Sequence, residues 1–484
     1  MSSPLRRAAS VDPSPPSPGE RLPDRVAAGL RQRARRRLDG LRAAADARWG
    51  RPRDESRPIY LVAPAGHPNH GDEQLLAGWL RYLRHRLPGT PVVVDCHTPG
   101  QAAVLHHAEH PDVLFTDTLW RLAGEHAGYE PSAADAGADS EATATHAAAV
   151  VAFCRHAVAD LGTRPALASG IELLRSASII HLIGGGYVND QWPHHLGVVA
   201  GAAEAGRLAD ANVVATGQGF TPCADVGPLA DALAGFDLVT VRDAASRRLL
   251  ADTDAPVHLV GDDGWLSLAG GGGIEAGDHP VYSDDPHAAR DLVLCAQSDL
   301  AEPEVVAGAV AQILAAWKIP GERITVVESI PGGDRVVWDL VCARADAASG
   351  TDAGTVGGGD DDEVGHALAG LQLPMARFVP FQELWATGLP ARSGQVWLTT
   401  RFHPHLFAAA RGASGVALRS GSAYYDVKHA SLADAGSPWA TVNAHDVVVD
   451  PRVPNPPTAG GFDSSAVSAL IAAAEALADE VYPL

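Results

Sequence analysis

The sequence Arg401-Phe402-His403 combines residue types that suit an anion site with a proton donor beside it. The apolar run 396–398 before it and three alanines after it predict a buried strand ending near Arg401 and a helix beginning near His403. Ligands of open α/β sheets bind at such strand ends, beside helix N-termini. Arginine offers a fixed fork of donors to carboxylate or phosphate, and histidine can move a proton near neutral pH. The alternative is structural: Arg401 caps a helix or pairs with an aspartate, and His403 is a structural histidine that makes its hydrogen bonds within the protein.

Two further cations follow predicted strands. Arg242 comes directly after the apolar run 238–241 and before Asp243, the natural N-cap of the next helix. Lys428 follows the predicted strand 414–418, where it can face a phosphate as a point charge. The plainer alternatives are that Arg242 pairs with an acid at its own turn and that Lys428 is a surface lysine. If these strand ends share one cleft, the cations form a local anion site.

Glycines and one acid complete the set of candidate site residues. Gly71 and Asp72 open a helix after the first predicted strand, where a glycine lets backbone donors approach a ligand. Asp72 either caps that helix or holds a substrate hydroxyl. Two more strands end in glycine-rich turns that form a rim of backbone donors in the predicted fold. We therefore predict four substrate-binding residues at these turns besides the cations: Gly71, Gly185, Gly186 and Gln218.

The same turns offer little for a metal or a nucleotide cofactor. His67 and His70 lack an evident third ligand, and Asp262-Asp263 is more typical of a turn than of a metal site. The sequence contains neither a Gly-x-Gly-x-x-Gly fingerprint nor a Gly-Lys-Ser/Thr phosphate loop. We predict neither a metal nor a bound cofactor.

Alternating strands and helices must position these residues. Apolar runs predict strands, and patterns of helical period fall between several of them, which is typical of βαβ units in parallel sheets. The predicted strands are 59–63, 91–95, 179–183, 212–216, 237–241, 257–260, 291–296, 323–328, 376–379, 396–400 and 414–418. The predicted helices are 73–86, 194–208, 243–251, 302–316 and 403–411.

A chain of 484 residues is too long for one ordinary core, so we expect two domains. The N-terminal Rossmann-like domain is expected over 56–268 and the C-terminal one, with the donor site, over 287–450. A tail and helix follow over 451–484, and a disordered or basic helical arm precedes the domains over 1–55. That arm either contacts acidic lipid or packs as a solvated helix.

Composition excludes several classes of protein. The formal net charge of -21 argues against general nucleic-acid binding, which requires a basic face. Five scattered cysteines argue against a disulfide framework and favour a reducing compartment. No signal-peptide pattern or membrane-spanning apolar run is evident, so we expect a cytoplasmic protein, peripheral to a membrane if the arm contacts lipid.

Three segments interrupt the alternation. Residues 128–148 are rich in alanine and acids, and residues 347–363 are rich in glycine and aspartate. We interpret both as surface loops. The run of four glycines at 270–273, within 268–286, indicates an interdomain hinge or flexible loop.

Taken in order, the motifs resemble those of the polysaccharide pyruvyl transferase family. The series is a Gly-Asp helix start, a triple-glycine strand end, Gly-Gln-Gly, Val-Arg-Asp-x-x-Ser, Gly-Asp-Asp, Arg-x-His and Tyr-x-x-Lys, over residues 58–432. The family's Arg-Leu-His has Phe402 as its middle residue here, and Pro404 follows where the family has a small residue.

The resemblance implies an α/β fold with two Rossmann-like domains in a glycosyltransferase-B-like arrangement and an interdomain cleft. It implies transfer of a pyruvyl group from phosphoenolpyruvate to a pair of sugar hydroxyls, which become a ketal. The reaction would belong to cell-surface glycan synthesis. The saccharide acceptor would be lipid-linked if the N-terminal arm contacts a membrane. By similarity, Arg242, Arg401 and His403 lie at the donor site, with Phe402 as its apolar wall. In our hypothesis, His403 protonates the donor, Asp72 deprotonates the sugar hydroxyl, and Lys428 assists the arginines.

Two other functions fit the same residues. A nucleotide-sugar-dependent glycosyltransferase of this architecture would use the arginines to hold a diphosphate, because function lies in the site and not in the fold. A non-catalytic member of a glycan assembly complex would use the arm and loops for contacts.

Overall fold

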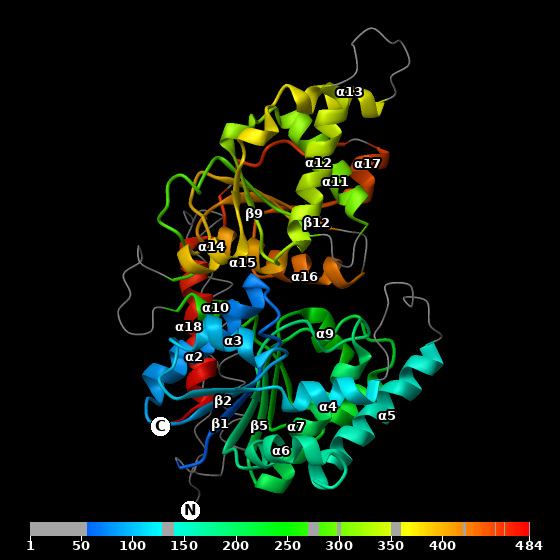
Figure 1. Ribbon diagram of the computed structural model, residues 1–484, viewed down its shortest axis with the longest axis vertical. Helices are drawn as coiled ribbons and strands as arrows, with labels where there is room; N and C mark the ends of the chain where they lie inside the picture. Colours follow the sequence, from blue (N-terminus) through cyan, green and yellow to red (C-terminus); the bar gives the residue numbers. More distant parts are fainter. Residues whose placement is uncertain are drawn as a thin grey trace, which may run out of the picture.

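The computed structural model describes residues 56–127, 140–269, 280–297, 302–349, 360–419, 423–450, 452–458 and 460–483. The predicted arm over 1–55 and the core of the predicted hinge, 270–279, lie outside these residues. Two lobes are stacked along the long axis, each built on its own parallel sheet (Figure 1).

The first sheet has seven parallel strands in the order β3-β2-β1-β4-β5-β6-β7. This order reverses between β1 and β4, which is the doubly wound topology with its crevice at the reversal point. The strands are β1 (Ile59–Val62), β2 (Val92–Asp95), β3 (Val113–Thr116), β4 (Ile179–Leu182), β5 (Asn212–Gln218), β6 (Leu238–Val241) and β7 (Val257–Leu259).

Helices cover both faces of this sheet because successive strand residues point to opposite sides. Ile59 and Leu61 of β1 join one apolar cluster, and Tyr60 and Val62 join the other. The helices of this region are α2 (His70–Arg86), α3 (Pro99–His106), α4 (Thr118–Ala127), α5 (Ser140–Ala159), α6 (Ala168–Arg175), α7 (Leu196–Ala209), α8 (Val226–Leu233), α9 (Ala244–Leu249) and α10 (Gly264–Ser267).

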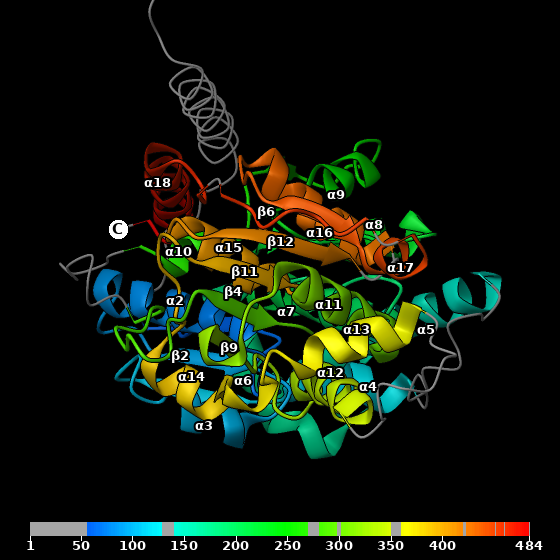
Figure 2. The same cartoon turned by 90° about the horizontal axis from the view of Figure 1, so that it is seen from above.

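The second sheet repeats the pattern with six strands in the order β10-β9-β8-β11-β12-β13, so its reversal lies between β8 and β11. Figure 2 looks down on this domain, with helices on both sides of the strands. Its strands are β8 (Leu292–Cys295), β9 (Ile324–Val327), β10 (Arg377–Val379), β11 (Val396–Thr399), β12 (Ser414–Arg419) and β13 (Ala440–Asn443). Its helices are α11 (Pro303–Trp317), α12 (Gly333–Ser349), α13 (Asp360–Ala369), α14 (Phe381–Thr387), α15 (Phe402–Ala410), α16 (Ala423–Asp434) and α17 (Ala444–Val449).

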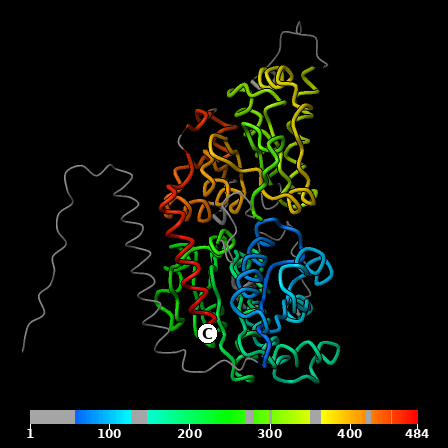
Figure 3. Tube along the Cα trace, turned by 90° about the vertical axis from the view of Figure 1, so that its left-hand side faces the viewer, coloured from blue at the N-terminus to red at the C-terminus, as the bar shows by residue number. Residues whose placement is uncertain are grey.

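The last helix, α18 (Ser464–Val481), packs on both domains. Val467 and Leu470 contact the apolar cluster of the second domain, whereas Leu477 and Val481 belong to a cluster of the first. Figure 3 shows this helix running alongside both lobes, with the C-terminus at the first. The chain thus crosses back to the first domain after completing the second.

The predicted alternation of strands and helices is confirmed, and the fold is α/β with two Rossmann-like domains, each built on its own parallel sheet. The expected loop over 128–148 is wrong from Ser140 onward, where α5 begins. That helix packs closely on α7, since a Cβ at Gly197 would lie 2.6 Å from Cys154 Sγ. The acidic run 360–363 is likewise helical, because acids are stabilised in the first turn of a helix such as α13.

None of the helices in the described part of the chain has both the length and the apolar character that crossing a membrane requires.

Candidate functional site

The carboxyl ends of both sheets face each other where the two lobes meet, and the start of α15 lies against the start of α2 (Figure 1). The two domains are joined there by a backbone hydrogen bond of 2.9 Å from His70 N–H to the Ser329 carbonyl. The first turn of α2 is stabilised locally, since the Asn69 side chain accepts from the Gly71 N–H at 3.3 Å. Asn69 is therefore the N-cap, and the interpretation of Asp72 as the cap is wrong.

His403 lies between the two domains. Its Nε2 is 3.4 Å from Oδ1 of Asp262, which follows β7 in the first domain. A Cβ placed on Gly71 would lie only 2.0 Å from His403 Nδ1, so the imidazole packs directly on the α2 backbone. Only glycine admits this approach at position 71. Residues of the first domain thus contact an imidazole of the second domain.

Arg242, at the end of β6, also reaches across the interface. Its Nη1 donates to Oδ2 of Asp262 at 3.2 Å, and the pair is almost completely buried. Its guanidinium lies 4.7 Å from the ring centroid of Phe402 in the other domain, within cation–π range. Gly219 leaves room for the side chain, because a Cβ there would approach Arg242 Nε to 2.8 Å.

Asp262 lies against both His403 and Arg242. It was not among the site residues predicted from the sequence. Burial raises the pKa of its carboxyl, but His403, Arg242 and the Gly264 N–H outweigh that effect and lower the pKa to about 2. Asp262 is therefore a carboxylate at neutral pH. The Gly-Asp-Asp turn after β7 was the available signal, although its partner His403 belongs to another domain.

Asp72 and Lys428 lie at the more exposed side of this group, since both side chains are only partly buried. Asp72 Oδ2 accepts a 2.8 Å hydrogen bond from Asn69 Nδ2. Burial raises the pKa of Asp72, while the positive charges of His403 and Lys428 oppose the rise. The structure therefore brings six predicted site residues into one region: Gly71, Asp72, Arg242, Phe402, His403 and Lys428.

Arg401 points away from that group. Its Nε donates to both carboxylate oxygens of Asp334, at 2.9 and 3.0 Å, and its Nη2 donates to Oδ1 as well. The same carboxylate accepts from the N–H groups of Ser329 and Ile330. Arg401 thus has the aspartate partner that the structural interpretation expected, and its role at the donor site stays a prediction.

The glycine-rich strand ends of the first domain are bonded internally. Gly185 bonds to Gly217 and Gly219 across the ends of β4 and β5. The Gln218 amide nitrogen donates to the carbonyl of Ile183 at 2.8 Å. Gly186 accepts a 2.8 Å bond from Asn189. Substrate contacts by Gly185, Gly186 and Gln218 stay predictions.

Asp263 holds this region together. Its Oδ2 accepts from Trp79 Nε1 at 2.7 Å, from the Gly184 N–H at 2.8 Å and from Thr216 Oγ1 at 2.6 Å. Burial raises its pKa to about 6, although these bonds oppose the rise. Two adjacent aspartates therefore have different roles, one at the interface and one inside the first domain.

Behind the Arg401 strand end, two buried histidines form a chain with a fixed direction. A carbonyl can only accept, so His429 Nε2 donates to Thr400 O at 3.1 Å. Neutral His429 then accepts at Nδ1 from His405 Nδ1, also at 3.1 Å. His405 Nε2 in turn accepts from Ser437 Oγ at 2.7 Å. The chain connects α16, which carries Lys428, to α15, which carries His403, and it requires both rings to be neutral.

Among the described residues, no three histidine, cysteine or acidic side chains are grouped as metal ligands. His67 is exposed whereas His70 is buried, so these two histidines are not presented together.

The arrangement combines an imidazole, a guanidinium and two carboxylates at facing strand ends. These groups can neutralise an anion, donate a proton and accept one, which are the operations of acid–base group transfer. In the closed arrangement seen here, His403 and Arg242 are each less than a tenth exposed.

Solved structures with a similar course of the chain include three sugar-related proteins. UDP-GlcNAc 2-epimerase from Neisseria meningitidis is 9% identical, with a TM-score of 0.39 over 87% of this chain and 100% of its own. The UGT2 protein of Phytolacca americana is 11% identical, with a TM-score of 0.42 over 88% and 94%. The trehalose 6-phosphate synthase of Burkholderia multivorans is 11% identical, with a TM-score of 0.39 over 88% and 93%. Identities and TM-scores this low say nothing about the activity of this chain.

A search among curated proteins finds no sequence match. A family model described as polysaccharide pyruvyl transferase matches residues 69–311, half of the chain. The match begins at the N-cap of α2 and includes Asp72, Arg242 and Asp262, whereas His403 and Lys428 lie beyond it. The chain belongs to the polysaccharide pyruvyl transferase family.

Proposed function

We propose that this protein transfers the pyruvyl group of phosphoenolpyruvate to two hydroxyls of a saccharide acceptor, forming a cyclic ketal and releasing phosphate. Family membership supports the transferase class and a saccharide acceptor. The observation that carries the proposal is the position of His403, held against Gly71 and Asp262 of the opposite domain.

The donor carries a carboxylate and a phosphate and therefore needs cations. Arg242 and Lys428 supply these from the two domains, and charge-assisted hydrogen bonds to such anions are stronger than neutral ones. Arg401 has a supporting role in this scheme, because two of its nitrogens already donate to Asp334. It fixes the turn from β11 into α15, which carries His403.

Proton transfer begins at the methylene carbon of the donor. His403, as an imidazolium beside the Asp262 carboxylate, gives its proton to that carbon, and the neighbouring carbon becomes electrophilic. A sugar hydroxyl attacks this carbon while Asp72 accepts the hydroxyl proton. A second hydroxyl then displaces phosphate from the same carbon, which closes the ketal. The proton of this hydroxyl returns to His403, and the proton held by Asp72 goes to the departing phosphate. Phosphoenolpyruvate and a diol thus give a ketal and inorganic phosphate, without an oxidant or reductant.

Burial raises the pKa of Asp72, and a carboxylate that takes up a proton more readily than a free aspartate suits a group that accepts and returns one. Asp262 is unsuited to that role, because its pKa of about 2 keeps it ionised. The two carboxylates therefore have different roles in the proposed mechanism: Asp262 stabilises positive charge, and Asp72 transfers a proton.

The test is calorimetric binding of phosphoenolpyruvate at low salt, combined with phosphate release in the presence of saccharide acceptors. We expect His403→Ala to bind the donor with little change and to lose turnover by about 10²- to 10⁴-fold, the usual contribution of a general acid. Gln382→Ala, on the exposed surface of α14, is the control. If the wild type ignores phosphoenolpyruvate but binds uridine or guanosine diphosphate sugars, the proposal fails in favour of a glycosyltransferase.

A further inference from the structure

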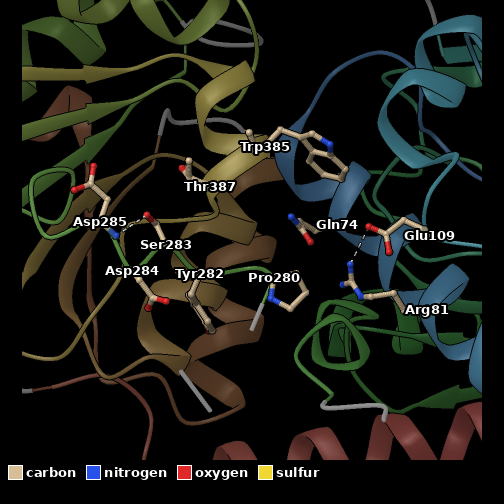
Figure 4. Close-up of a pocket in the computed structure, with 11 residues that line it drawn as sticks. Gln74, Arg81, Glu109, Pro280, Tyr282, Ser283, Asp284, Asp285, Trp385 and Thr387 are labelled. Carbon is tan, nitrogen blue, oxygen red and sulfur yellow. Dashed lines mark hydrogen bonds and ion pairs between the residues drawn. The ribbon is translucent and has the colours of Figure 1, made fainter. Parts of the chain in front are cut away.

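A pocket of about 540 Å³ opens between the two domains, beside the buried group of His403, Arg242 and Asp262. Its first-domain wall is formed by α2 and by Glu109, and its second-domain wall by residues 280–285 and the end of α14 (Figure 4). This volume lies within the range of small-molecule sites, roughly 300–1,000 Å³. None of the pocket residues belongs to the catalytic group described above.

Polar atoms without partners line the first-domain wall. Gln74 is only 3% exposed and projects from α2 into the pocket (Figure 4). Its Oε1 has no hydrogen-bond partner among the residues that the structure describes. Arg81 lies two turns further along the same helix face, and its Nη2 is buried without a partner, although Nη1 is 3.5 Å from Glu109. Buried polar atoms are normally paired, so an unpaired acceptor and donor facing one pocket point to a polar ligand.

The second-domain wall adds an aromatic surface. The Trp385 indole is half-buried and is held edge-on by His106 and His70, at centroid distances of 5.2 and 6.5 Å. An aromatic face surrounded by hydrogen-bonding groups suits a molecule with apolar C–H faces and many hydroxyls, as a saccharide has.

The charges of the pocket decide against an anion. One cation, Arg81, is accompanied by three acids, Glu109, Asp284 and Asp285. A negative pocket of this kind repels phosphate and carboxylate groups, including those of phosphoenolpyruvate. The pocket and the cationic group at His403 thus favour opposite kinds of ligand.

An aromatic wall separates the two places. The ring of His403 stacks on Phe407 at 6.1 Å, Phe407 contacts His70 at 6.4 Å, and His70 contacts Trp385 at 6.5 Å. A sugar in the pocket is therefore on the far side of this wall from His403. We propose that the pocket binds a neutral saccharide unit of the acceptor, remote from the unit whose hydroxyls receive the pyruvyl group. This inference rests on the proposed function for its link to pyruvyl transfer.

The experiment measures glycan and donor binding separately. Wild type, Trp385→Leu and Gln74→Leu are applied to an array of neutral and anionic oligosaccharides, and the bound glycans are titrated by calorimetry. Trp317→Leu is the matched control, since this tryptophan is also half-buried in the second domain but bonds to Pro454 outside the pocket. Phosphoenolpyruvate is titrated into every variant.

We expect the wild type to bind neutral oligosaccharides, and Trp385→Leu and Gln74→Leu to weaken that binding about tenfold or more, with donor affinity unchanged. The control should retain both affinities. The inference is overturned if the wild type binds no neutral glycan, or if the pocket variants bind as the wild type does. A wild type that does not bind phosphoenolpyruvate would instead contradict the proposed function. The glycan titrations would still show whether the pocket binds a neutral saccharide.

Discussion

Arg242 and Arg401 lie just beyond the carboxyl ends of β6 and β11, and both are buried, yet their partners differ. Arg242 donates to Asp262, which also faces His403, and its guanidinium covers Phe402 of the opposite domain. Arg401 donates twice to Asp334 within its own domain. The strand end places each arginine, whereas the element facing it decides whether the arginine joins the interface between the domains or an ion pair within one domain.

The difference also concerns what happens when the domains move. Separating the domains would expose Arg242 and remove its contact with Phe402. The same motion leaves the Arg401–Asp334 pair intact, because both members move with the second domain. Arg242 is therefore the arginine whose environment depends on the relative position of the two domains.

The largest expected effect is on stability, in Arg401→Ala. Truncation leaves the buried Asp334 carboxylate without its cation, and breaking such a pair lowers the unfolding free energy by about 3–5 kcal/mol. Denaturant unfolding followed by tryptophan fluorescence measures this loss. Arg323→Ala is the control, because its pair with Asp291 is 58% exposed on each side and should contribute less than about 1 kcal/mol. A stable Arg401→Ala protein that fails to bind phosphoenolpyruvate would show that Arg401 binds the donor and is not a structural residue.

Arg242→Ala should mainly affect donor binding. We expect the dissociation constant for phosphoenolpyruvate to rise by roughly 30-fold, which corresponds to about 2 kcal/mol for a charged hydrogen-bonding partner. The loss of stability should be smaller than in Arg401→Ala, because Asp262 retains the Gly264 N–H at 2.8 Å and the nearby His403. Calorimetry and unfolding on the same sample separate these effects. Unchanged donor affinity would remove Arg242 from the site.

Acid should weaken the region behind Arg401. Burial lowers the pKa of His429 to about 4, and burial also lowers that of His405. Unfolded histidines take up protons below about pH 6.5 while these rings stay neutral in the folded state, so stability decreases as pH falls from 6.5 towards 4, by about 1.4 kcal/mol per pH unit and histidine. His429→Gln should have a shallower slope in pH-dependent unfolding. An identical slope would show that this histidine titrates alike in both states.

The smallest effect is expected for Phe402→Leu, which removes the ring that covers Arg242. The lost cation–π contact, about 0.5–1 kcal/mol, should weaken donor binding by roughly two- to fivefold. Phe378→Leu is the matched control, since it removes a similar contact with Arg335 at 5.1 Å, away from the site. Equal effects of both changes would indicate a general loss of packing.

The interior strands were predictable because they are buried on both faces and appear as continuous apolar runs. The edge strands β3 and β13 were missed because their residues are mostly half-buried or exposed. The apolar run of β3 is only three residues long, and β13 alternates apolar and polar residues. The Ala-rich start of α5 was taken for a loop because it lacks an apolar period, although alanine is the strongest helix former.

The candidate site was predictable only in part. Residue type and strand-end position indicated His403, Arg242 and Lys428 before any contact was known. Asp262 was missed because its importance depends on His403 of another domain. The partner of Arg401, Asp334, lies in the first turn of α12, 67 positions away in the sequence, and no local pattern indicates such a pairing.

The position of α18 has a consequence for how the chain is made. Leu477, Ala478 and Val481 complete a core that begins with Ile59, and the Tyr482 hydroxyl bonds to the buried His181 at 2.7 Å. The first domain therefore cannot finish folding on the ribosome when its own strands emerge. It must wait, with an apolar groove open, until the second domain and residue 482 have been synthesised. The core of the first domain thus depends on a helix that follows the second domain in the sequence.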